Sequence, residues 1–167
     1  MFKTFKMWDF EIEKILNTDK NFIGCFPHDK LPNIKNKLNC SIIINTGDSG
    51  TEGKHWVAVK MTKNKCFYFD SFGVKIEEEN IKRFVSMYDK VLYSNICIQD
   101  IRSKKCGEFC IAFINKVNNI RGYEKFIKYF DDIEMYLNDF IVYDLLEKHK
   151  TKKIKIKKLK KLKIKKI

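Results

Sequence analysis

Two short runs, HWVAVKM (55–61) and KCFYFD (65–70), most strongly limit what this chain can fold into. Both are rich in β-branched and aromatic residues, and only residues 62–64 separate them. Such a pair of apolar runs predicts a β-hairpin. A third run, LNCSIIIN (38–45), is β-branched and apolar and predicts a further buried strand.

Segments with helical periodicity precede and follow these predicted strands in the sequence. Residues 9–17, 76–92 and 106–117 are predicted to be helices, because their apolar side chains recur three and four positions apart. Residues 123–148 predict one or two more helices, with a break near Asp131 and Asp132. No internal repeat is evident.

Two other segments complete the expected order of elements. VLYSNICIQ (91–99) predicts another core strand, whereas NFIGCFPHDKLPNI (21–34) contains both prolines and predicts an extended loop. Helix, strands, helix, strand and helices in this order indicate an α+β fold. A chain of 167 residues is long enough for one domain with a substantial core.

The charge of the chain is unevenly distributed. Residues 150–167 contain 11 lysines and no acidic residue, which leaves the other residues with a net charge of only +2 out of a total of +13. We therefore divide the chain into a domain, 1–149, and a basic tail, 150–167. A polycationic tail is typical of proteins that bind phosphate backbones or an anionic membrane surface.

The tail lacks a clean amphipathic face, because its apolar residues scatter around a helical wheel. We expect it to be disordered in isolation and to order on a polyanion, if at all. DNA is the expected partner, and a tail serving only solubility or nuclear targeting is the alternative. The candidate DNA-binding side chains are Lys152, Lys153, Lys157, Lys158, Lys160 and Lys161.

The cysteine pattern excludes several other classes of protein. The six cysteines show no disulfide framework, and no CxxC motif occurs. With no histidine near Cys106 and Cys110, we expect no metal site. There is no apolar run of about 18 residues and no signal-peptide pattern at the N-terminus. These features favour a reduced, intracellular protein without a membrane span.

Cys106 is the candidate nucleophile. It stands where the predicted helix begins, and the free N–H groups and dipole of a helix start favour a thiolate there. Cys110 lies one turn further along the same face. Both could instead be small buried residues, since free cysteine is often buried.

A histidine that could pair with this thiolate is His55, which opens the strand after the glycine-bearing loop TGDSGTEGK. Asp70 ends the paired strand, nearly opposite His55 across the hairpin, and could orient the imidazole. The alternative for Asp70 is a turn-forming hydrogen bond to the next residues. Gln99, at a predicted strand end, could donate to an oxyanion beside the N–H of Cys106.

The order His, Asp, Gln, Cys resembles that of the adenovirus endopeptidase (adenain) family, a branch of the ubiquitin-like-protease superfamily. The resemblance covers roughly residues 20–117. It rests on FIGCFPHDKLP, LNCSIIINTGDSGTEGKHW, GKHWVAVK, CFYFDSFG and a Gln followed six residues later by CGEFC. It implies a papain-like α+β fold, with a central mixed sheet flanked by helices and the nucleophile at the N-terminus of a buried helix.

The resemblance also implies a role for each matched residue. Cys106 would be the nucleophile, His55 the general base and acid, Asp70 the group that orients His55, and Gln99 part of the oxyanion hole. Trp56 and Gly107 would contact the substrate: Trp56 lines a narrow channel that favours small residues such as Gly.

The family implies a biological setting as well. Its members cleave viral precursor proteins at short Gly-containing motifs during particle maturation, so we expect capsid or core precursors as substrates. We expect a monomer in the host nucleus or viral factory, packaged in the virion, from a virophage- or polinton-type element or a related virus. The alternatives are a SUMO- or ubiquitin-deconjugating protease, and a basic DNA-packaging protein without enzymatic activity.

The sequence departs from the family in its activation features. The segment between Asp70 and Gln99 is shorter, and Cys97 is too close to Gln99 to match the cysteine that bonds the family's activating peptide. The chemistry needs no cofactor, and DNA or an activating peptide would serve only as an activator.

Overall fold

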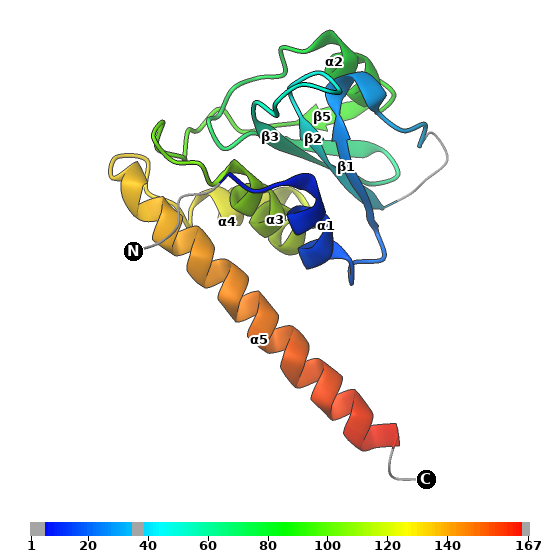
Figure 1. Cartoon of the computed structure of the whole chain (residues 1–167), viewed down its shortest axis with the longest axis vertical. Helices are drawn as coiled ribbons and strands as arrows, with labels where there is room; N and C mark the ends of the chain where they lie inside the picture. Colours follow the sequence, from blue (N-terminus) through cyan, green and yellow to red (C-terminus); the bar gives the residue numbers. More distant parts are fainter. Residues whose placement is uncertain (1–5, 35–38, 165–167) are drawn as a thin grey trace.

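The computed structural model describes residues 6–34 and 39–164, and for residues 153–164 it describes the backbone alone. A mixed five-stranded sheet lies at the centre, with helices on both of its faces (Figure 1). The predicted α+β fold is therefore confirmed. The strands, in spatial as well as chain order, are β1 (Phe22–Pro27), β2 (Cys40–Asn45), β3 (Trp56–Met61), β4 (Lys65–Phe69) and β5 (Lys90–Leu92).

The predicted hairpin forms the middle of this sheet. β3 and β4 pair antiparallel, with Met61 opposite Cys66 and Ala58 opposite Phe69. β2 pairs antiparallel with β3, whereas β1 and β5 lie parallel to their neighbours at the two edges. β2 is buried along its whole length, as its continuous apolar sequence predicts.

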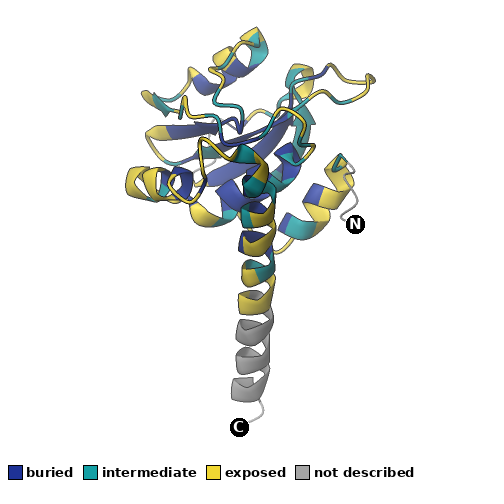
Figure 2. Ribbon diagram, turned by 90° about the vertical axis from the view of Figure 1, so that its left-hand side faces the viewer, coloured by how far each residue is buried: buried dark blue, intermediate teal, exposed yellow. Residues whose placement is uncertain are grey.

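The helices divide unequally between the two faces of the sheet. The elements are α1 (Asp9–Leu16), the 3-10 turn η1 (His28–Lys30), α2 (Glu79–Val85), α3 (Cys106–Lys116), α4 (Ile120–Ile127), the 3-10 turn η2 (Met135–Leu137) and α5 (Asn138–Ile164). Side chains of α1, α3, α4 and α5 pack with those of one face, and α2 packs against the other. Buried residues consequently line both faces of the sheet (Figure 2).

Alternation along the strands explains this two-sided core. In β2, Ile43 faces the larger helical layer, while Ile42 and Ile44 face α2. The larger core is aromatic: Phe69 stacks on Phe113 of α3 with ring centroids 4.8 Å apart. This packing fixes α3 against the centre of the sheet.

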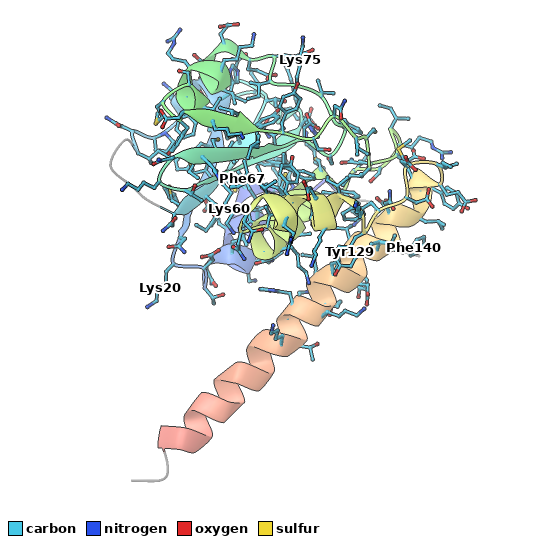
Figure 3. The ribbon with its side chains drawn as sticks, turned by 180° about the vertical axis from the view of Figure 1, so that it is seen from behind. Lys20, Lys60, Phe67, Lys75, Tyr129 and Phe140 are labelled. Atoms are coloured by element: carbon cyan, nitrogen blue, oxygen red, sulfur yellow. The ribbon has the colours of Figure 1, made fainter. Side chains whose placement is uncertain are left out.

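Lys60 of β3 ties the sheet to the far end of α3 (Figure 3). Its Nζ donates to the Ile114 carbonyl at 2.8 Å and to Asn118 Oδ1 at 2.9 Å. A cation suits the carbonyl end of a helix. Burial lowers the pKa of this ammonium, and the charge of Asp19 acts in the opposite direction.

Three predicted segments differ from the observed structure. The helix predicted over residues 76–92 is observed only as α2, Glu79–Val85, and residues 90–92 form β5. The expected loop 21–34 contains β1, which tolerates Pro27 because that residue ends an edge strand. The expected strand 91–99 ends at Leu92. Beyond it, backbone N–H groups bond elsewhere: Ser94 N donates to the Tyr123 hydroxyl, and Ile98 N to the carbonyl of Ser71. These partners hold the segment out of the sheet.

The predicted break near 131–132 separates α4 from η2 and α5. In the described part of α5, the buried apolar residues are Val142, Leu145 and Leu146. The tail predicted to be disordered forms the C-terminal part of α5 as far as Ile164. No helix among the described residues is long and apolar enough to cross a membrane.

Candidate active site

The structure brings His55, Asp70 and Cys106 together at one end of the sheet. His55 immediately precedes β3, Asp70 immediately follows β4, and Cys106 is the first residue of α3. His55 Nε2 lies 2.9 Å from Asp70 Oδ1, and the Cys106 side chain is close enough to the same imidazole to raise its pKa. Because Nε2 faces the carboxylate, Nδ1 is the nitrogen left for the thiol.

The hairpin register explains why His55 and Asp70 meet. With Ala58 opposite Phe69, position 55 projects opposite position 72. The ring of Phe72 accordingly packs on the His55 imidazole, with centroids 4.8 Å apart. Asp70 lies two positions away, within reach of the imidazole along the diagonal.

Asp70 makes both of the predicted interactions, the turn-forming bond and the bond with His55, and it makes them with the same oxygen atom. Asp70 Oδ1 accepts from the backbone N–H of Phe72 at 2.8 Å, which is the expected turn-forming bond, and it also accepts from His55. Only 7% of the Asp70 side chain is exposed. The turn therefore holds the carboxylate in the position from which it meets the imidazole.

The electrostatics of this cluster favour a charged imidazole. Burial alone would lower the pKa of His55, but hydrogen bonds with Asp70 and Cys106, together with their charges, raise it to about 9. His55 is thus suited to carrying a proton beside an anion at neutral pH. With 17% of its side chain exposed, it remains reachable by another molecule.

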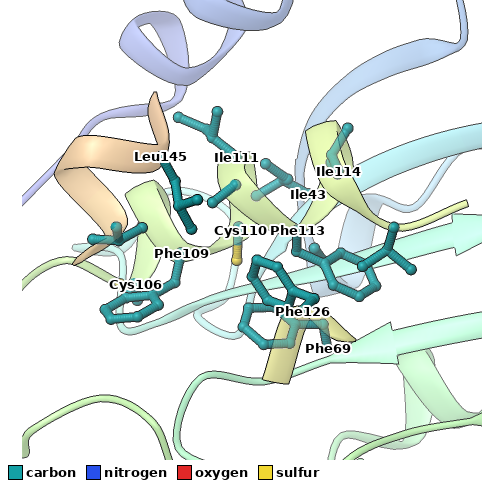
Figure 4. Close-up of a cluster of buried hydrophobic side chains, with 14 of the residues drawn as sticks. Ile43, Phe69, Cys106, Phe109, Cys110, Ile111, Phe113, Ile114, Phe126 and Leu145 are labelled. Carbon is teal, nitrogen blue, oxygen red and sulfur yellow. The ribbon is translucent and has the colours of Figure 1, made fainter. Parts of the chain in front are cut away.

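Cys106 and Cys110 differ in their surroundings. Cys106 has its backbone at the positive end of α3 and keeps 6% of its surface exposed. Cys110 is fully buried in the larger core, near Phe113 and Phe69, and its Sγ donates to the carbonyl of Trp56 (Figure 4). Burial raises the pKa of the Cys110 thiol well above its usual value. All six cysteines are free thiols.

Gln99 is buried beside this cluster and held by hydrogen bonds on both sides of its amide. Its Oε1 accepts from Ser71 Oγ at 2.6 Å, and its Nε2 donates to the carbonyl of Ser103 at 3.0 Å. Two backbone N–H groups, of Ile98 and Gln99, also donate to the Ser71 carbonyl. One of the two amide hydrogens of Gln99 thus remains outside the hydrogen bonds of the described residues.

The motif Asp-Ser-Phe-Gly that ends β4 therefore organises several parts of the site. Ser71 holds Gln99, and Phe72 packs on His55. Gly73 has a φ of +68°, and a Cβ atom there would lie 2.7 Å from the carbonyl carbon of Ile96. Glycine is required for both reasons. Sequence reasoning assigned roles to Asp70 alone, although the hairpin register could have indicated Phe72.

Trp56 and Gly107 occupy different surroundings, although both contact the N-terminal segment. Trp56 lines a pocket of about 290 Å³ together with residues 6–9 and 47–53, and its Nε1 donates to the Met7 carbonyl at 2.9 Å. A Cβ atom on Gly107 would lie 3.1 Å from Met7 Cβ. Gly107 therefore allows the N-terminal segment to approach α3. The side chains of the candidate DNA-binding residues other than Lys152 lie outside the described residues.

Comparison with known proteins identifies the family to which this chain belongs. The family profile described as adenovirus endoprotease matches residues 22–133, a span that contains all four candidate catalytic residues. No curated protein sequence matches the chain.

Among solved structures, the African swine fever virus (ASFV) pS273R protease superposes with a TM-score of 0.52 at 20% identity, covering 84% of this chain and 67% of that one. The selenomethionine form of that protease superposes with a TM-score of 0.39 at 25% identity, covering 62% and 43%. The first of these shows a shared fold. Since the family profile spans more than half of the sequence, the chain belongs to the adenovirus endoprotease family of cysteine peptidases.

Proposed function

We propose that this cysteine peptidase is a viral maturation endopeptidase that cleaves capsid or core precursor proteins at short Gly-containing motifs. One observation carries the proposal: His55 lies between Asp70, which it meets at 2.9 Å, and Cys106, whose side chain raises the pKa of the same imidazole. Nucleophile, base and orienting carboxylate are the three side chains that covalent acyl transfer by cysteine requires.

In the proposed acylation step, His55 Nδ1 holds the proton of Cys106, and the thiolate attacks the carbonyl carbon of the scissile peptide. The tetrahedral intermediate then collapses, and the C–N bond breaks. His55 gives its proton to the leaving amine, and a thioester with Cys106 remains. Asp70 stabilises the imidazolium and keeps Nε2–H directed away from the substrate.

In the proposed deacylation step, neutral His55 takes a proton from water, and the resulting hydroxide attacks the thioester. The C–S bond breaks, the acid product leaves, and the thiolate–imidazolium pair is restored. The carbonyl oxygen becomes negative in both steps. We assign its stabilisation to the free amide hydrogen of Gln99 and to the backbone N–H of Cys106.

Substrate recognition is proposed to use the pocket beside Trp56. The indole is 6% exposed and its N–H is bonded to Met7, so it forms a rigid wall. The lining of this pocket does not include His55, Asp70, Gln99 or Cys106, so the proposed preference for glycine next to the cleaved bond rests on the resemblance to the family. Gly107 contacts Met7, and we therefore place its role in packing the N-terminal segment.

The decisive experiment compares Cys106→Ala with Cys110→Ala, using peptides with Gly-containing sites and capsid precursors as substrates. Hydrolysis should disappear in Cys106→Ala and persist in Cys110→Ala. Fluorogenic adducts of SUMO and ubiquitin should be included in parallel. Cleavage of those adducts alone would favour a deconjugating enzyme, and processing that survives in Cys106→Ala would refute the proposed nucleophile.

We also propose that the tail, residues 150–167, binds DNA, and that the protein acts as a monomer in the host nucleus or viral factory and is packaged in the virion. Eleven lysines without an acidic residue support the DNA proposal. Each engaged phosphate should contribute about −0.9 to the slope of log affinity against log salt concentration. DNA, or an activating peptide, would change the rate without supplying a reacting group.

The test of the tail is deletion of residues 150–167, with DNA binding measured at two salt concentrations. Affinity should fall and the salt dependence should become shallow. A deletion that leaves both unchanged would assign the tail to solubility or targeting.

A further inference from the structure

The loop from Gln99 to Lys105 carries the oxyanion side of the proposed site. It contains no helix or strand of its own, yet it presents the Gln99 amide at one end and leads into α3 at the other. A loop without internal regular structure is placed by the contacts that it makes with its surroundings. The contacts of this loop converge on Ser103.

Ser103 connects both ends of the loop. Its carbonyl accepts from Gln99 Nε2 at 3.0 Å, and its Oγ accepts from the backbone N–H of Lys105 at 3.2 Å. The hydroxyl then donates to Asp139 Oδ1 at 2.7 Å. Asp139 is 36 residues beyond Ser103 in the sequence and lies in the first turn of α5.

The preceding residue of α5 holds the start of the same segment. Asn138 is fully buried, and its Nδ2 donates to the carbonyl of Ile98 at 2.8 Å. The amide also bonds Asp131 in both directions, at 2.6 and 2.9 Å. The first turn of α5 thus bonds to this segment at two points. Asn138 holds Ile98, just before Gln99, and Asp139 holds Ser103, which in turn bonds the Gln99 amide.

We propose that Asp139 is a positioning residue for the oxyanion side of the active site, acting through Ser103 on the Gln99 amide. It touches neither substrate nor thiol. Charge-assisted hydrogen bonds such as that from the Ser103 hydroxyl to the Asp139 carboxylate are stronger than neutral ones. The inference rests on the proposed function, because it needs an oxyanion to form.

This role separates two reactions of the same thiol. Peptide hydrolysis passes through a tetrahedral oxyanion, whereas alkylation of a thiolate by iodoacetamide does not. Loss of Asp139 or Ser103 should therefore slow hydrolysis and leave alkylation of Cys106 unchanged. A general loss of structure would slow both.

The experiment measures kcat, KM and the iodoacetamide rate for Asp139→Ala, Ser103→Ala and the double variant. We expect kcat to fall about tenfold in each single variant, which is less than the loss of about 100-fold or more that follows removal of an oxyanion donor itself. The double variant should lose no more than either single one, because both act on one path. KM and the alkylation rate should stay within about twofold.

Two further variants make the result specific. Asp139→Asn keeps an acceptor oxygen and should retain kcat within about threefold. Asp144→Ala, on the exposed side of the same helix, where Asp144 pairs with Lys148, should be unchanged. If Asp139→Ala does not fold, Ser103→Ala and Asp139→Asn decide the question.

Three results would each overturn the inference. The first is an unchanged kcat in both single variants, the second is a loss of alkylation in parallel with the loss of hydrolysis, and the third is a loss of kcat in the double variant that equals the product of the single losses. Failure of the proposed function is distinguishable, because it would leave Cys106→Ala active or would restrict cleavage by the wild-type protein to the SUMO and ubiquitin adducts. An inactive Cys106→Ala beside fully active Asp139→Ala and Ser103→Ala would reject only the role of Asp139.

Discussion

Substitution of Asp70 by Asn should move the titration of His55. Burial disfavours the imidazolium, yet bonds with Asp70 and Cys106 hold the pKa of His55 at about 9 against an ordinary 6.5. That difference corresponds to about 3 kcal/mol in favour of the charged ring. Hydrogen bonds to charged groups contribute about 1.5–3 kcal/mol each. Asp70→Asn should therefore lower the pKa of His55 to about 7–8.

The assay is an NMR titration of the imidazole signals, which is practical because the chain has only three histidines. A matched control is available in Asp48→Asn. Asp48 Oδ1 lies 3.0 Å from Nε2 of His28, a pair of similar geometry outside the candidate site. This control should leave the titration of His55 unchanged.

The same substitution should change the pH dependence of hydrolysis. The leaving amine needs the proton of His55, so kcat/KM should fall as the pH rises through the pKa of His55. The alkaline limb should lie near pH 9 in the wild-type enzyme and move to lower pH in Asp70→Asn. A His55 that still titrates near 9 in Asp70→Asn would refute the assignment of Asp70 as its partner.

Three further outcomes are expected. Gly73→Ala should lower the free energy of unfolding, measured by urea titration, by about 2 kcal/mol or more. Gly50 also has a positive φ but faces open space, so Gly50→Ala should lower it by about 1 kcal/mol. Equal decreases in the two variants would refute the close backbone contact at Gly73. Because the pKa of His55 is raised, its contribution to stability should be complete below about pH 6.5 and lost as the pH rises through about 9. The fall should reach about 3 kcal/mol in wild type relative to His55→Gln, and parallel curves would contradict it. Deletion of 150–167 should shift the melting temperature by less than about 2 °C, since the buried apolar residues in the described part of α5 end at Leu146; a larger shift would show that the tail packs on the domain.

Local sequence pattern was sufficient where structure is local. The β3–β4 hairpin, α3 and the break before α5 follow from apolar spacing and from the three residues that link the strands. The hairpin also predicted that His55 and Asp70 would approach each other, because antiparallel pairing converts sequence distance from the turn into spatial opposition.

Sequence pattern did not predict the structure of segments whose hydrogen-bond partners are distant in the sequence. Residues 93–99 have the composition of a strand, but Ser71 and Tyr123 take their backbone N–H groups. Ser103 and Asp139 are individually ordinary polar residues, and only the packing of α5 reveals their bond. β1 was missed because its proline suggested a loop, although the edge position makes proline acceptable.

The hairpin between His55 and Asp70 has a consequence for how sequences of this kind can diverge. Extra residues between Met61 and Lys65 would lengthen a turn and leave the strand pairing intact. One residue inserted within β3 or β4 would instead displace one partner by about 3.3 Å and turn every later side chain to the opposite face. Length variation should therefore concentrate at the turn, and the number of residues within each strand should be preserved among active homologues.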